Sequence, residues 1–169
     1  MAITPPDIPL GEAGVGHKIE FAAPSPDLAP YLGGFYSYHL RVADGVHHEE
    51  VFLPSWAHIR VLTYGSDWSM QIGRLTFFPV PRLSLCGPSS LAGIAPVSTG
   101  NLFGVSLSPR GWARLIRTNA ARMADNIIPL SDVLPKQSED IWSNVLEATD
   151  FSGQIAAMEA VLCQRLAST

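Results

Sequence analysis

Charged residues are scarce in this sequence, and the balance of charge is negative. Lys and Arg number 11 and Asp and Glu 15 among 169 residues, which gives a net charge of −4 and a charged fraction of 15%. An average domain carries about 25% charged residues, so part of this surface is predicted to face a partner. Because nucleic acids are bound through clustered positive charge, the chain by itself is predicted not to bind DNA.

Cysteines and long apolar runs are also nearly absent. Cys86 and Cys163 have no metal-binding or redox spacing and cannot form a disulfide framework. The first 16 residues lack the basic start and apolar run of a signal peptide, and no apolar run approaches the roughly 18 residues of a membrane helix. We therefore expect a cytoplasmic protein without membrane contact, built as one domain or one domain with a small appendage.

Residues before Ser108 have the pattern of short β-strands. Runs rich in Val, Ile, Phe, Tyr and Trp are separated by Gly, Pro, Asp and Ser, as in an all-β sandwich or barrel. Seven or eight strands are expected among the runs 17–21, 31–42, 47–53, 57–64, 68–72, 75–80, 83–86, 91–97 and 101–107.

From Ser108 onward the apolar residues recur with a helical period. Ser108 is the predicted N-cap of a first helix, and Pro109 its first residue. A second helix is predicted to open at Ser138, and a third at Asp150 or Ser152. The first helix carries several arginines opposite its apolar face, and these are interpreted as its solvent-exposed face rather than as phosphate contacts. They are Arg110, Arg114 and Arg117, with Arg122 close behind.

The apolar stripes on the second and third helices must be buried somewhere. One stripe can pack on the β module, and the remainder is predicted to pack on a second copy of the chain, because a homodimer is the commonest oligomer. The residues assigned to this dimerisation surface are Trp142, Val145, Ile155, Met158 and Leu162.

None of the following catalytic motifs is complete in the sequence. The run 104–108 departs from the nucleophile elbow because Ser108 stands where the last glycine belongs. The run 14–16 lacks the third glycine of a dinucleotide site, and no Gly-rich loop is followed by Lys and Ser or Thr. No catalytic residue is assigned, and the protein is predicted not to be an enzyme.

The best metal candidate is the run His47-His48-Glu49-Glu50. Neighbouring strand residues point to opposite faces, so at most one of these histidines could act with Glu49 or Glu50, helped by His39 or His58 from other strands. No His-x-His spacing exists in the sequence. The alternative interpretation is that this run is only the polar first part of a strand. We therefore expect neither a bound metal nor a cofactor.

Aromatic residues gather on the central strands. Such side chains can simply fill a small barrel, or they can line an apolar pocket with a few orienting polar groups, and the sequence leaves both readings open. His58 alternates against Ile59 and Val61, so it fits poorly if those two face inward. The residues assigned to the pocket are Tyr36, Tyr38, His58, Arg60 and Trp68.

Short landmarks occur in a characteristic order along the chain. They are Pro26-x-Leu28-x-x-Tyr31, Phe35-Tyr36, Leu53-Pro54, Cys86-Gly87-Pro88, Gly104-Val105-x-x-x-Pro109-x-Gly111-x-x-x-Leu115 and Leu130-x-Asp132-Val133. In this order and spacing the chain, from about Pro24 onward, resembles the N-terminal sensor domain of AraC-type transcriptional regulators, in the subgroup whose domain is cupin-like.

The resemblance implies an α+β fold, with a cupin-like β-barrel or sandwich followed by about three helices. It divides the chain into a sensor module over residues 1–107 and a helical, dimerising appendage over 108–169. It also implies a small-molecule effector, a homodimer, and DNA contact through a C-terminal helix-turn-helix domain. Nothing in this chain reads as a basic recognition helix, so DNA is expected to be contacted only by a domain outside it.

The predicted function is therefore a regulatory, non-catalytic, ligand-sensing and dimerisation domain. The alternative is a small cupin-like, metal-dependent enzyme acting on a small metabolite, and a third reading is a purely structural dimerisation domain with a filled barrel. The sequence names neither the effector nor the DNA site, nor whether the regulator activates or represses.

Overall fold

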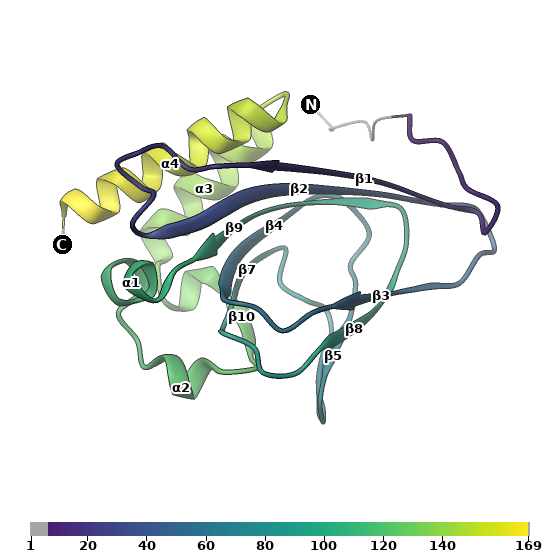
Figure 1. The fold of residues 1–169 in the computed structure, drawn as a ribbon, viewed down its shortest axis with the longest axis horizontal. Coiled ribbons are helices and arrows are strands. Elements are labelled where there is room, and N and C mark those ends of the chain that lie inside the picture. The colour runs from purple at the N-terminus through teal and green to yellow at the C-terminus, as the bar shows by residue number, and fades with distance from the viewer. Residues whose placement is uncertain (1–6, 169) are drawn as a thin grey trace.

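In the computed structural model, which describes residues 7–168, ten strands form two antiparallel sheets and are followed by helices (Figure 1). The six-stranded sheet, called sheet A, has the order β1-β2-β9-β4-β7-β10, and the four-stranded sheet B has the order β3-β8-β5-β6. The strands are β1 Val15–Ala22, β2 Leu32–Val42, β3 His48–Phe52, β4 Ala57–Gly65, β5 Met70–Ile72, β6 Leu75–Phe77, β7 Leu83–Cys86, β8 Gly93–Val97, β9 Gly100–Leu107 and β10 Ile127–Pro129. The sheets do not close into a barrel, so the fold is an open two-sheet α+β arrangement with more strands than expected.

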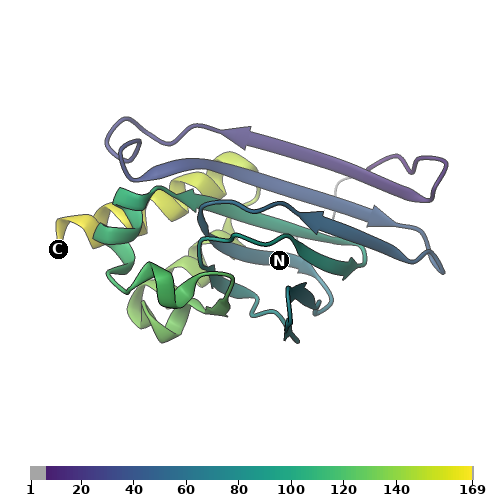
Figure 2. The same cartoon turned by 60° about the horizontal axis from the view of Figure 1, so that its bottom comes forward.

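Sheet A is the middle layer of three. The two long helices, α3 (Pro135–Glu147) and α4 (Phe151–Ala167), pack on one of its faces, and sheet B packs on the other. Strands β1 and β2 run past the helices toward the opposite end of the molecule (Figures 1 and 2). Two separate apolar cores result, one between the helices and sheet A and one between the sheets.

Strand alternation explains how sheet A serves both cores. On β4, Ile59 and Val61 are fully buried against the helices, whereas His58 and Arg60 point to the side of sheet B. His58 can therefore face the interior although Ile59 and Val61 also do, because both faces of this strand are covered. A central strand between two layers needs no solvent face.

The segment after β9 is less regular than a run of three helices. Ser108 is the predicted N-cap, confirmed by its Oγ accepting a hydrogen bond from the amide of Gly111 at 3.0 Å. The first helix is a single turn, α1 (Pro109–Gly111), followed by the π-helical turn η1 (Trp112–Ile116), which ends at the left-handed residue Arg117. Next come α2 (Ala120–Met123), β10 and the 3-10 turn η2 (Leu130–Asp132).

The starts of the two long helices differ in how well they were predicted. Helix α3 begins at Pro135, three residues before the predicted Ser138, because proline is favoured at the first helical position and its missing N–H costs nothing there. Helix α4 follows Asp150, one of the two predicted starts, and the Asp150 carboxylate accepts a hydrogen bond from the Gly153 amide at 2.7 Å. No helix among the described residues is long and apolar enough to cross a membrane.

Three of the five residues assigned to a dimer contact lie fully inside this chain. Val145, Met158 and Leu162 are fully buried in the core between the helices and sheet A, and Trp142 and Ile155 pack against that core half-buried. The physical reason is that both long helices lie flat on sheet A, so one sheet face covers both stripes. Fully buried side chains have no accessible area to offer a second chain.

Candidate functional site

Arg60 is the central polar residue between the two sheets. Its Nε donates a hydrogen bond to the Tyr36 hydroxyl at 2.9 Å, and its guanidinium lies over the Phe52 ring, 5.1 Å from the ring centroid. The Cys86 thiol is a further neighbour. Within residues 7–168 no carboxylate forms an ion pair with Arg60. The inter-sheet space thus holds a cation without an anionic partner.

The backbone register of sheet A creates the room that this pair occupies. Tyr36 on β2 and Arg60 on β4 both lie opposite Gly104 on β9, in one row across three strands. Gly104 has no side chain, and a Cβ added there would overlap the Tyr36 ring. The Tyr36 ring therefore crosses β9 to reach Arg60, which no residue larger than glycine at 104 would permit.

His58 stands beside this pair as a neutral imidazole. Burial, and to a lesser extent the nearby Arg60 charge, lowers the pKa of His58 to about 3. Its ring packs edge-on against Tyr36, and its Nε2 forms a hydrogen bond with the Ser55 hydroxyl at 2.9 Å. Its buried Nδ1 has no hydrogen-bond partner among the described residues. Burial also raises the pKa of Tyr36 against the opposing Arg60 charge, so Tyr36 stays a neutral phenol.

Two small cavities lie between the sheets on either side of Phe52. One, of about 30 Å³, is lined by residues that include Arg60, His58 and Phe52. The other, of about 40 Å³, is lined by residues that include Tyr38, Phe52 and Trp68. Each has room for only a few waters, far below the several hundred Å³ of a drug-sized site.

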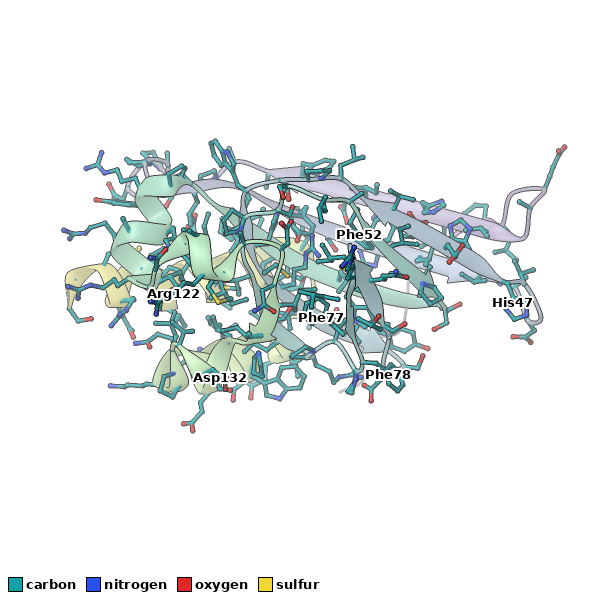
Figure 3. All side chains as sticks on the ribbon, turned by 90° about the horizontal axis from the view of Figure 1, so that it is seen from below. His47, Phe52, Phe77, Phe78, Arg122 and Asp132 are labelled. Carbon is teal, nitrogen blue, oxygen red and sulfur yellow. The ribbon has the colours of Figure 1, made fainter. Side chains whose placement is uncertain are left out.

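The five residues predicted to line a pocket all point into the space between the sheets. Phe52 joins them, because it contacts Arg60 on one side and the Trp68 ring, 5.8 Å away, on the other. The sequence argument missed Phe52, although its alternation with Glu50 in the run 47–53 was a usable signal. Figure 3 shows Phe52 and Phe77 in the middle of the molecule, and His47 at the end opposite the helices.

A second polar cluster lies where the edge strands of the two sheets meet. His17 on β1 and His48 on β3 each donate from Nε2 to the same Glu50 oxygen, Oε1, at 2.7 and 2.6 Å. Burial alone would raise the pKa of Glu50, but hydrogen bonds from His17 and His48, together with the nearby Tyr38 hydroxyl, outweigh it and lower that pKa. The carboxylate is therefore ionised and turned toward both imidazoles.

Tyr38 borders the same cluster. Its ring centroid is 5.8 Å from that of His17, and burial together with the nearby Glu50 carboxylate raises the pKa of Tyr38 well above its ordinary value. The Tyr38 hydroxyl lies close enough to Glu50 for the carboxylate charge to raise its pKa. It nevertheless forms no hydrogen bond of good geometry with any described residue. A second orphaned polar atom, the Trp68 indole N–H, belongs to the same inter-sheet core.

The other histidines and acids of the predicted metal set lie elsewhere. His47 and Glu49 are exposed, and His39 faces the helix side of sheet A, where it bonds Ser37 at 2.9 Å. His58 belongs to the Arg60 group. His17 takes their place beside Glu50. His17 pairs with Leu40 and Ile19 pairs with Tyr38, so these four side chains share the face of sheet A that is turned toward β3.

Comparisons with protein-family models, with curated proteins and with solved structures give no significant match for this chain.

Proposed function

We propose that the chain is a regulatory, non-catalytic domain that binds a small organic anion between its two sheets, with Arg60 holding the anionic group. The observation that carries the proposal is a guanidinium held between two sheets without a carboxylate partner among the described residues. Burying an unpaired charge costs free energy, and an anionic ligand offsets that cost. Arginine binds carboxylate or phosphate through a planar fork, which also fixes the ligand's orientation.

The surroundings of Arg60 suit an organic ligand rather than a bare ion. Phe52 provides an aromatic wall, with Trp68 packed behind it, and Tyr36 fixes one edge of the guanidinium through its hydroxyl. The neutral His58 adds a polar but uncharged group, so the positive charge of this group of residues is that of Arg60. A few polar anchors within apolar walls are typical of small-molecule sites.

Ligand entry requires the sheets to separate, because the present cavities hold only a few waters. Sheets A and B share no hydrogen-bonded pair of strands, so they can part without breaking a ladder. A ligand that binds the separated arrangement more tightly shifts the population toward it. In this way a small molecule can change the position of sheet B relative to the helices.

The order of sequence landmarks supports assigning this sensor to the AraC type, with a cupin-like sheet arrangement. In that assignment the domain works as a homodimer, and DNA is bound by a helix-turn-helix domain outside this chain. The dimer surface then lies outside the fully buried stripe residues of α3 and α4. The net charge of −4 fits a sensor that does not itself contact DNA.

A small cupin-like, metal-dependent enzyme is the second candidate. The observation that favours it is the group His17, His48 and Glu50, which adjoins the inter-sheet space. Metal-dependent conversion of a bound anion separates an enzyme from a sensor, because a sensor releases its ligand unchanged.

The sensor proposal is tested by titrating the purified chain with a panel of small mono- and dicarboxylates and with inorganic phosphate. Thermal unfolding and calorimetry serve as readouts. At least one carboxylate is expected to raise the Tm saturably, and Arg60→Gln is expected to weaken its binding at least about tenfold, as loss of a charge-assisted pair does. Arg114→Gln, which removes an exposed arginine, is the matched control. A panel without any binder, or equal binding by Arg60→Gln, overturns the proposal.

A further inference from the structure

His17, His48 and Glu50 form a compact group of metal-ligating atoms. The two imidazole nitrogens and the carboxylate oxygen all lie within 4.8 Å of one another. The side chains are partly exposed, at 40% for His17, 29% for His48 and 21% for Glu50, so an ion can reach them from solvent. It is the one such group of three among residues 7–168.

The fold places these ligands from two different sheets. His48 and Glu50 are two residues apart on β3 and therefore project to the same side of that strand. His17 comes from β1, the edge strand of sheet A, whereas β3 is an edge strand of sheet B. These two strands share no ladder, so the three side chains themselves connect the sheets at this point.

The convergence of both imidazoles on a single carboxylate oxygen is informative. In a tetrahedral site with bonds of about 2.0–2.2 Å, ligand atoms lie roughly 3.3–3.5 Å apart. The two nitrogens approach Glu50 Oε1 to 2.7 and 2.6 Å, so small side-chain rotations suffice to admit an ion among the three atoms. His48 and Glu50 already lie side by side, because they are two residues apart on one strand.

A fourth polar atom, the hydroxyl oxygen of Tyr38, lies beside the group. The Tyr38 hydroxyl is buried beside Glu50 without a hydrogen bond of good geometry to any described residue, and its ring lies against His17. A buried hydroxyl without a partner is uncommon in a native fold and points to a missing ligand or water. A metal-bound water next to Glu50 would satisfy it.

We propose that His17, His48 and Glu50 bind one divalent transition-metal ion of the zinc class, with Tyr38 bonded to a water in an open position. Two imidazoles and one carboxylate are a donor set that selects Zn²⁺, Fe²⁺ or Co²⁺ over Ca²⁺ and Mg²⁺, which prefer all-oxygen sites. The proposed site differs from the sequence-based expectation of no metal, which considered the run 47–50 with His39 and His58 but not His17. It does not depend on an anion at Arg60.

The test is titration of the chelator-treated, full chain with Zn²⁺ by calorimetry and with Co²⁺ by visible absorption. One ion per chain is expected, with a Kd in the micromolar range or below. His17→Gln, His48→Gln and Glu50→Gln are each expected to weaken binding at least tenfold. The neighbouring exposed residues provide matched controls, and His47→Gln and Glu49→Gln are expected to bind like the wild type.

Three outcomes overturn the proposal: millimolar affinity, more than one ion per chain without a tight site, or an equal loss in the His47→Gln and Glu49→Gln controls. The last result would mean loose chelation by the exposed run rather than a built site. Circular dichroism of each variant verifies folding. His17→Gln tests the site independently, because His17 lies on β1 and not in the run 47–50. Arg60→Gln is expected to retain metal binding, so failure of the metal site and failure of the anion site are distinguishable.

Discussion

Gly104 sits at the middle of sheet A, where the ring of Tyr36 passes over the backbone of β9. The absence of a side chain at this one position lets a tyrosine on β2 reach an arginine two strands away. Gly111 has a similar role near the first helical turn, where a Cβ would overlap the Tyr31 carbonyl. Both glycines belong to the landmark run that begins at residue 104, which gives that run a packing reason.

Gly104→Ala is expected to lower the free energy of unfolding by about 1–3 kcal/mol, as overpacking of a filled core does. The added methyl group overlaps the Tyr36 ring and pushes the hydroxyl away from Arg60. Urea unfolding measures the loss. In a Tyr36→Ala background the same substitution is expected to cost much less, because the space is then free. Strictly additive losses would contradict the geometry.

His58 makes stability depend on pH in a defined window. Its pKa is about 3 in the folded chain and near the ordinary 6.5 when unfolded. Between these values the unfolded chain binds a proton that the folded chain does not, so stability falls as the pH drops from 6.5 toward 3. The slope from this residue is up to about 1.4 kcal/mol per pH unit.

The contribution of His58 is measured as the difference between the wild type and His58→Gln in urea unfolding across pH 4 to 8. Above pH 6.5 the two curves are expected to run parallel, because the imidazole is neutral in both states. Below pH 6.5 the wild type is expected to lose stability more steeply. Parallel curves over the whole range would mean that His58 titrates normally in the folded chain.

At the scale of elements, alternation and end signals predicted most of the strands, and the misses have physical causes. Strand β10 pairs with β7 although it lies in the helical part of the chain, and a three-residue strand carries too little periodicity to be seen. The first helix was predicted to be regular, but it widens into the π-turn η1 and stops at Arg117. That turn depends on tertiary packing of Trp112, whose indole N–H donates to the Thr118 carbonyl at 2.7 Å.

The cap of α4 is testable by itself. Asp150→Ala removes the acceptor for the Gly153 amide and is expected to cost about 1 kcal/mol, or roughly 2–4 °C in Tm. Ser152→Ala, an exposed change in the same turn, is the control and is expected to leave Tm nearly unchanged. An equal effect of both substitutions would mean that the cap contributes little.

The burial of the helical stripe predicts how a charge placed in it behaves. Leu162→Glu puts a carboxylate into the core between α4 and sheet A, and a loss of about 4 kcal/mol or more is expected. Cys163→Glu, at the exposed neighbouring position, is expected to fold normally. Near-ultraviolet circular dichroism measures whether each variant keeps its tertiary packing, and light scattering measures its mass. A folded Leu162→Glu variant with a reduced mass would instead place this stripe in a dimer contact.

At the scale of the whole molecule, the sequence could place candidate residues on strand faces but could not bring two sheets together. The lining set was predicted because Tyr36, Tyr38, His58 and Arg60 alternate on two strands that happen to be neighbours of β9. The meeting of His17 with Glu50 depends instead on how the edge of one sheet lies against the edge of the other. No local pattern encodes that distance, since the two residues are 33 positions apart and share no ladder.

The two cores differ in size, and this difference predicts which sheet opens more readily. Among the described residues, 20 buried side chains form the core between the helices and sheet A, against 9 between the sheets. Because apolar burial is the main stabilising contribution to folding, sheet B is expected to open more readily than sheet A.

Hydrogen exchange of the ligand-free chain is therefore expected to be faster in β3, β5, β6 and β8 than in β2, β4 and β9. The amides of α3 and α4 are expected to exchange with the slow group, because they share its core. Under the proposed function, this ordering would allow a small molecule to enter at Arg60 by separating the sheets while the helical layer stays folded. If both sheets exchanged at one common rate, the molecule would open only as a whole, and ligand entry between the sheets would require global unfolding.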